Sequence, residues 1–197
     1  MSQSTGFGQD GASAGVVFVA GSPSADSRSQ KLLLHLQERL NQRSVGTQLF
    51  AVRDFPGQAL IGADTTAPAV KQFVDAVKLA RAIVLATPVY KATYAGALKA
   101  LIDLIPQDAL VGKSALAVAT AREPAHFITT RRAFDDLFAF FRLGRTLRPV
   151  FLLDAQVHSE AGRAIFDAEV EVLLSTAADE LLLPQPAQTR ALKFHAR

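Results

Sequence analysis

The sequence has 197 residues, of which 49% are hydrophobic and 20% are charged, and this length and composition suit one α/β domain with a substantial core. The formal net charge is only +3, and basic residues gather only between 131 and 148, so a nucleic-acid-binding face is not indicated. The chain has no cysteine, which excludes disulfides, thiolate chemistry and cysteine-ligated metals. It shows neither a membrane-length apolar segment nor a signal peptide, so we expect a cytoplasmic protein that binds no membrane.

The two ends of the chain lack the periodic apolar residues of packed elements. Residues 1–14 are rich in Ser and Gly, and residues 185–197 contain few large apolar side chains. Such segments depend on a partner for order. We therefore expect one domain over residues 15–184, with flexible tails at 1–14 and 185–197.

Five short apolar runs have strand length and no polar alternation, as expected for strands covered on both faces. They are residues 16–20, 47–52, 82–87, 114–120 and 148–153. Helical apolar spacing lies between and after them, at residues 32–40, 70–77 and 98–105, from about His126, and from about Ser159 to Leu182. The alternation predicts a flavodoxin-like, doubly wound, five-stranded parallel sheet in the order 2-1-3-4-5, with ligands outside the carboxyl ends of the strands.

The segment GSPSADSRS, residues 21–29, joins the first predicted strand to the first predicted helix. It has one glycine and no lysine, so it matches neither the dinucleotide fingerprint nor the P-loop. Its serine hydroxyls and Arg28, placed at a helix N-terminus, favour a mononucleotide phosphate. The alternative is a solvated loop in which Asp26 or Ser27 caps the helix, because capping residues have the same composition.

The segment TPVYKATYAG, residues 87–96, follows the third predicted strand and holds both tyrosines of the chain. Aromatic and backbone groups at this edge of the sheet can line a flat ring whose phosphate lies at the first loop. A proline turn with tyrosines packed on their neighbours is the alternative. A third loop, TAREPAH at residues 120–126, ends the fourth predicted strand at the same edge.

Residues 21–33 and the run ATPVYKATYAGALKALIDLIPQDALVGK at 86–113 together resemble the NAD(P)H-dependent FMN reductases of the sulfonate-utilisation type, a branch of the flavodoxin-like flavin reductases. The resemblance implies that the FMN phosphate lies at the first loop and the ribityl chain and ring at the second. The matching positions are Ser22, Ser27, Arg28 and Ser29 in the first loop and Pro88, Val89, Tyr90 and Lys91 in the second. Thr120, Ala121 and Arg122 complete the expected cofactor-binding set. No side chain is expected to act as an acid or base, because hydride passes directly between the stacked rings.

The resemblance also implies that NADPH or NADH reduces FMN, and that the reduced flavin passes to a partner monooxygenase that releases sulfite from organosulfonates. Two alternatives stay open. One is a reductase that keeps FMN bound and reduces a quinone, azo dye or metal oxyanion, and the other is a catalytically silent flavin-binding homologue that acts through assembly.

The chain departs from the family pattern at two places. Ala121 and Arg122 stand where the family typically has a Gly-Gly pair, and only glycine lacks the Cβ that would meet the flavin ring. Arg132 stands where the reductases carry an aromatic ring in a helix at the subunit interface.

The predicted helix at 95–105 has more apolar surface than one sheet contact requires. Leu98, Leu101, Ile102 and Ile105 lie on one face, with Ala97 and Leu104 on another. A second copy of the chain could cover this surface, and the resemblance favours a tetramer built as a dimer of dimers; the alternative is a helix buried within its own domain. The histidines at 35, 126, 158 and 195 lie on separate elements, so no metal site is predicted.

Overall fold

The computed structural model describes residues 15–160 and 163–184. Within them, a sheet with five positions for strands forms the centre of the molecule. They are filled in the order β2 (Thr47–Ala51), β1 (Val16–Ala20), β3 (Ala82–Tyr90), β5 (Ser114–Ala121) and a last position shared by β6 (Arg145–Thr146) and β7 (Val150–Leu153). Both β6 and β7 pair with β5 in parallel, and Pro149 between them has no N–H to continue the ladder. The predicted parallel sheet and its order 2-1-3-4-5 are confirmed, with the fifth strand in two pieces.

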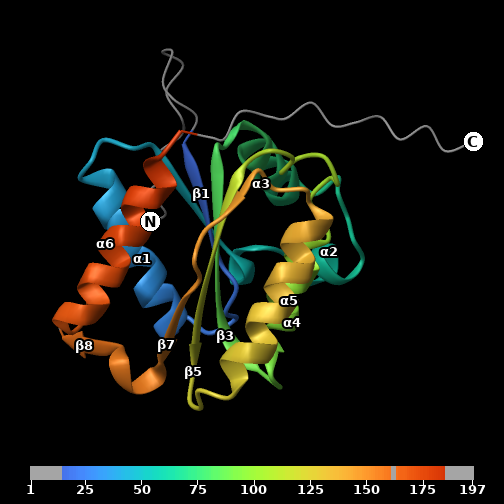
Figure 1. Cartoon of the computed structure of the whole chain (residues 1–197). Coiled ribbons are helices and arrows are strands. Elements are labelled where there is room, and N and C mark those ends of the chain that lie inside the picture. The colour runs from blue at the N-terminus through green and yellow to red at the C-terminus, as the bar shows by residue number, and fades with distance from the viewer. Residues whose placement is uncertain (1–14, 161–162, 185–197) are drawn as a thin grey trace, which may run out of the picture.

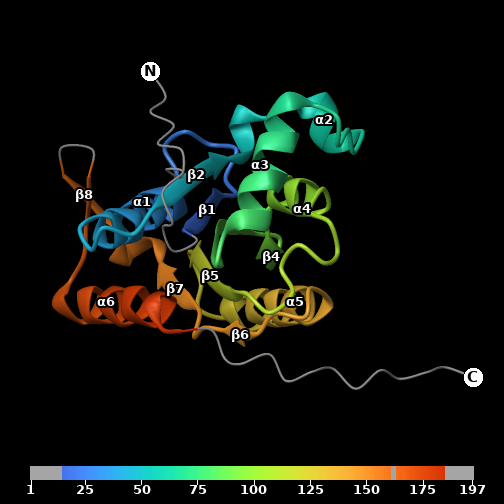
Figure 2. The same cartoon turned by 90° about the horizontal axis from the view of Figure 1, so that it is seen from above.

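Helices cover both faces of this sheet (Figures 1 and 2). The helices α1 (Arg28–Asn41) and α6 (Ala168–Leu182) pack on one face, and the other face carries α2 (Gly57–Ile61), α3 (Pro68–Leu79), α4 (Gly96–Ile102) and α5 (His126–Phe140). Alternate residues of β1 enter the two cores: Val17 and Val19 pack in the four-helix layer, and Phe18 packs against α1 and α6. Burial on both faces explains why the central strands have no polar alternation.

Two predicted boundaries are wrong. The last helix was expected from Ser159, but residues 158–165 form an antiparallel pair, β8 (His158–Glu160) and β9 (Arg163–Ile165), before α6 begins at Ala168. Ser159, Glu160 and Arg163 are polar and exposed, so this segment has no apolar face for a helix to bury. The third strand continues three residues beyond Thr87 and pairs with β4 (Thr93–Tyr94), so much of the expected loop is a hairpin.

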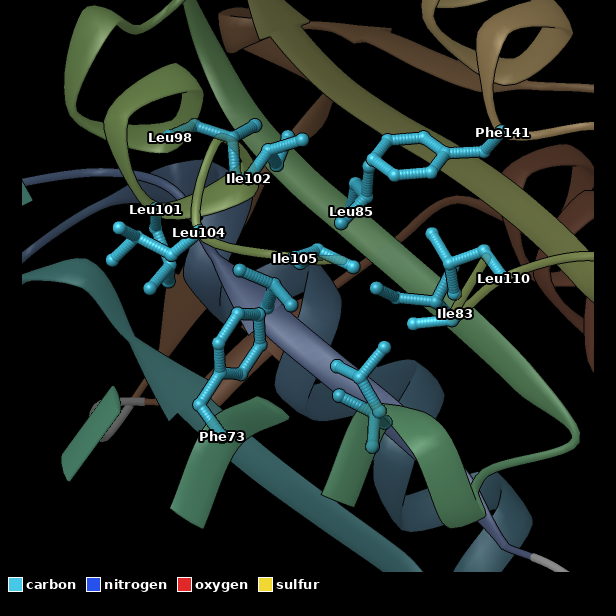
Figure 3. Close-up of a cluster of buried hydrophobic side chains, with 14 of the residues drawn as sticks. Phe73, Ile83, Leu85, Leu98, Leu101, Ile102, Leu104, Ile105, Leu110 and Phe141 are labelled. Atoms are coloured by element: carbon cyan, nitrogen blue, oxygen red, sulfur yellow. The ribbon is translucent and has the colours of Figure 1, made fainter. Parts of the chain in front are cut away.

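The apolar surface of α4 is covered inside the chain. Figure 3 shows its side chains directed toward β3 and Phe73 of α3. The buried residues of this helix and the turns after it are Leu98, Leu101, Ile102, Leu104 and Ile105. The helix is therefore buried within its own domain, which was the alternative to contact with a second copy. The width of its apolar surface no longer indicates such a contact.

Three further observations complete the comparison with the sequence. The short helix α2 and the two 3-10 turns at Val52–Asp54 and Asp154–Gln156 were not predicted. No helix in the described part of the chain is long and apolar enough to cross a bilayer. The expected tails, 1–14 and 185–197, lie outside the described residues.

Candidate functional site

A cleft of about 460 Å³ lies where the three predicted loops meet at the carboxyl edge of the sheet. Its size is in the range of small-molecule sites. Nine of the eleven residues predicted from the sequence line it: Ser22, Ser27, Arg28, Pro88, Val89, Tyr90, Thr120, Ala121 and Arg122. The sheet order brings these segments together because β1, β3 and β5 are neighbours and run in the same direction.

The first loop ends in a helix cap that faces this cleft. Ser27 is the N-cap of α1, and its Oγ accepts a hydrogen bond from the N–H of Gln30 at 3.4 Å. Ser27 Oγ also lies 2.9 Å from Ser29 Oγ, and Ser29 is buried beside it rather than lining the cleft. When Ser29 donates this bond, the Ser27 hydroxyl hydrogen is free for a ligand. The capping alternative is therefore correct for Ser27 and is compatible with phosphate binding.

Ser22 and the helix end complete a site suited to an anion. Ser22 Oγ accepts a hydrogen bond from the N–H of Ser24 at 3.2 Å, and both serines line the cleft. The first turn of α1 contains no acidic residue, so its free N–H groups and partial positive charge act unopposed within the helix. Arg28, at the first position of α1, adds a full positive charge.

Gly21 fixes where this loop leaves the sheet. Its N–H donates to the carbonyl oxygen of Ala86 at 2.7 Å, directly after the last paired residue of β1. A Cβ at position 21 would lie 2.7 Å from Leu98 Cβ and 2.8 Å from the Ala86 oxygen. The close approach of β1 to α4 thus requires glycine here, and it holds the serine loop next to the end of β3.

The second loop is held by a buried hydroxyl and a tight turn. Thr87 Oγ1 accepts from the N–H of Ala95 at 2.9 Å and donates to the Pro88 carbonyl at 2.8 Å. Lys91 and Ala92, with φ of 51° and 66°, form the two-residue turn between the paired strands β3 and β4, as in type I′ hairpins. Lys91 therefore lies at the turn and is not among the residues that line the cleft.

The two tyrosines of this hairpin have different surroundings. Tyr90 lines the cleft and is 47% exposed. Tyr94 packs on Phe134 of α5, with ring centroids 5.2 Å apart, and burial raises the pKa of its hydroxyl above the ordinary value. The packing alternative is thus correct for Tyr94, while Tyr90 is available to a ligand.

The backbone of the third loop does not require the glycines that are missing from it. Ala121 is the last residue of β5, where it pairs with Leu153 of β7, and it is buried at the edge of the cleft. Neither Ala121 nor Arg122 is among the described residues with positive φ, so side chains fit this backbone without strain. Arg122 is exposed and lines the cleft.

Four further residues line the cleft but were not in the predicted cofactor-binding set: Ser24, Asp26, His126 and Asp154. Asp26 pairs with Lys31, Oδ1 to Nζ 2.5 Å, and the hydrogen bond and charge of Lys31 lower the pKa of this carboxyl group. Asp154 lies 3.6 Å from Arg28, Oδ2 to Nη1. It follows β7 at the same edge of the sheet, so applying the carboxyl-end rule to the fifth strand would have found it.

The donor set fits the mononucleotide that the sequence suggested. Helix N–H groups, two serine hydroxyls and Arg28 suit a phosphate, and Pro88, Val89 and the Ala121 methyl group offer apolar surface for a ring. Within the described residues, no group of three His, Asp or Glu side chains could hold a metal ion. His35 instead contacts Glu171 at 3.2 Å and Phe166 edge-on.

The family model of the NADPH-dependent FMN reductases matches residues 15–158. The chain belongs to this family. An FMN reductase (NADPH) from Escherichia coli K12 is 36% identical over 83% of this chain and 86% of its own length. An FMN reductase (NADPH) from Pseudomonas putida KT2440 is 39% identical over 72% of each chain. A solved structure described as an apo form of NADH:FMN oxidoreductase (EMOB) has a TM-score of 0.80 at 30% identity, covering 90% of this chain and 92% of that one.

Family membership confirms the resemblance on which the sequence analysis relied. The protein is an oxidoreductase of the FMN reductase family, and FMN and a reduced nicotinamide nucleotide are its cofactors.

Proposed function

We propose that the protein transfers hydride from NADPH or NADH to FMN at the 460 Å³ cleft and then releases the reduced FMN to a flavin-dependent monooxygenase. The observation that carries this proposal is the meeting of the α1 N-terminus, Ser22, Ser27 and Arg28 with the apolar strand ends in one cleft. FMN supplies the hydride acceptor. The chain supplies binding and orientation.

The proposed residue roles follow from position. Ser22 and Ser27 donate hydroxyl hydrogen bonds to the phosphate, and Arg28 adds a charge-assisted one. Ser29 orients Ser27 through the contact between their hydroxyl oxygens. Val89 and Tyr90 follow Pro88 in β3, and Ala121 follows Thr120, the partner of Pro88 in β5, so these residues lie next to one another at the cleft and border the ring.

We propose NADPH or NADH as the hydride donor. The relatives from Escherichia coli and Pseudomonas putida are named for NADPH, and the solved structure is named for NADH. We propose organosulfonate desulfonation as the use of the reduced flavin, because the second loop resembles the sulfonate-utilisation branch most closely.

A steady-state assay tests the reaction and the site together. Purified protein should oxidise NADPH or NADH only when FMN is added. Arg28→Met should raise the FMN concentration needed for half-maximal rate by about 10–100-fold, because a charge-assisted hydrogen bond contributes about 1.5–3 kcal/mol. Arg131→Met is the matched control, because Arg131 is an exposed arginine on α5 whose partner is Asp135.

Other outcomes of this assay would contradict the proposal. FMN that copurifies tightly, with poor turnover of added flavin, would indicate a reductase that keeps its flavin and reduces another acceptor. Absence of FMN-dependent oxidation would contradict the proposed reaction, and FMN binding without that oxidation would indicate the catalytically silent flavin-binding homologue.

A further inference from the structure

An ion pair crosses the part of the cleft where the phosphate is proposed to bind. Arg28 Nη1 and Asp154 Oδ2 are 3.6 Å apart, and the two side chains are 56% and 27% exposed. This distance exceeds that of a charge-assisted hydrogen bond, and exposed ion pairs contribute only about 0–1 kcal/mol to stability. The pair therefore contributes little to the stability of the fold.

The position of Asp154 is unusual for an anion site. Leu153 pairs with Ala121, so Asp154 and Arg122 leave the sheet side by side and both line the cleft. A carboxylate here repels a phosphate dianion and draws Arg28 toward itself. The other carboxylate in the cleft, that of Asp26, pairs with Lys31 and feels Arg28 only through its charge, so the ion pair of Arg28 is the one with Asp154.

We propose that Asp154 is a positioning residue that sets the affinity of the cleft for FMN by competing with the FMN phosphate for Arg28. The inference rests on the proposed function, since it requires the phosphate to bind at Arg28. Binding of the phosphate displaces the carboxylate from the guanidinium, and loss of the phosphate lets the pair form again. Because the phosphate must first displace the Asp154 carboxylate, the affinity for FMN is lowered, and release of the flavin is favoured over its retention.

Neutralising the carboxylate while keeping its shape isolates this effect. Asp154→Asn should tighten FMN binding about three- to tenfold, because it removes an exposed ion pair and a like-charge repulsion. The gain should appear in a slower dissociation rate. Riboflavin has no phosphate, so its affinity should be unchanged, a result that a merely structural role of Asp154 would not give.

A double-mutant cycle, read by quenching of flavin fluorescence, tests whether Asp154 acts through Arg28. In the Arg28→Met background, Asp154→Asn should tighten FMN binding clearly less, because only the direct repulsion between the carboxylate and the phosphate is left to remove. Asp26→Asn is the matched control, because it removes a carboxylate from the same cleft that pairs with Lys31. It should change FMN affinity less than Asp154→Asn does. Thermal unfolding should show all variants folded, since each pair has one exposed partner and such pairs contribute little to stability.

The outcomes separate this inference from the proposed function. If Arg28→Met leaves FMN affinity unchanged, the proposed phosphate position is wrong. If Arg28→Met weakens FMN binding but Asp154→Asn fails to tighten it, only the role of Asp154 is overturned. The role of Asp154 is also overturned if Asp154→Asn tightens riboflavin binding as much as FMN binding. It is overturned as well if Asp154→Asn changes FMN affinity equally with and without Arg28.

Discussion

Single side chains in the cleft combine a structural and a ligand-directed role. Ser27 caps α1 with its oxygen, yet lines the cleft and contacts Ser29 through the same atom. A helix cap and a phosphate ligand are therefore compatible at one serine, because the oxygen accepts from the backbone while the hydrogen is available to a ligand. Sequence reasoning had set these two roles against each other.

Ala121 tests whether the missing glycines limit flavin binding. Its backbone does not require glycine, and the cleft is open beside its methyl group. Ala121→Gly should therefore change FMN affinity less than about threefold and cost about 0.5–1 kcal/mol of stability from backbone entropy. A large gain in FMN affinity, measured by fluorescence titration, would show that the methyl group obstructs the ring.

At the scale of elements, the site depends on how closely β1 approaches α4. Gly21→Ala would place a Cβ 2.8 Å from the Ala86 carbonyl oxygen, which cannot easily move within β3. We expect a loss of about 1–3 kcal/mol in urea unfolding, as for overpacked cores, together with weaker FMN binding. Gly57→Ala in α2 is the control, because its Cβ would meet nothing within 4 Å. Equal effects of the two substitutions would contradict the steric argument.

A half-buried lysine, Lys113, links the end of α3 to β5 and gives stability a pH dependence. Lys113 Nζ donates to the carbonyls of Val77 and Lys78, each at 2.6 Å, and burial lowers its pKa from 10.5 to about 8. Between these values the unfolded chain keeps a proton that the folded chain has lost, so this group adds stability as the pH rises. Below about 8 both states are protonated, and its contribution is constant.

Lys113→Met should remove this rise. The free energy of unfolding of the original protein, minus that of the variant, should increase between pH 8 and 10.5. Urea unfolding at several pH values measures it. Parallel curves for the two proteins over this interval would show that Lys113 titrates normally in the folded state.

The sequence predicted elements well where burial dictates a pattern, and less well where it does not. In the central strands and in α1, α3 and α5, the spacing of the apolar residues fits only one type of secondary structure. The hairpin of β8 and β9 does not, because its residues are mostly exposed and charged or small. Asp154 was missed because a single carboxylate after a strand carries no apolar signal, and Lys91 lies outside the cleft lining because it falls in the positive-φ turn of the hairpin.

At the scale of the whole molecule, the candidate cleft is built from distant segments of the chain, and the assembly of several copies is a proposal. We propose a tetramer, with exposed apolar residues of α5 at a contact between copies. Ile128 is 78% exposed on the helix that carries Arg132. Ile128→Glu should reduce the mass measured by light scattering, whereas Ile61→Glu, on the 85% exposed residue of α2, should not. A monomeric original protein would refute the proposal.

The most direct test of the account is a crystal structure of the protein with FMN. The account predicts the phosphate at Ser22, Ser27 and Arg28, the ring between Val89–Tyr90 and Ala121, and the Asp154 carboxylate displaced from Arg28. FMN bound elsewhere, for example in the groove between α1 and β9 lined by Lys31 and Arg163, would contradict it.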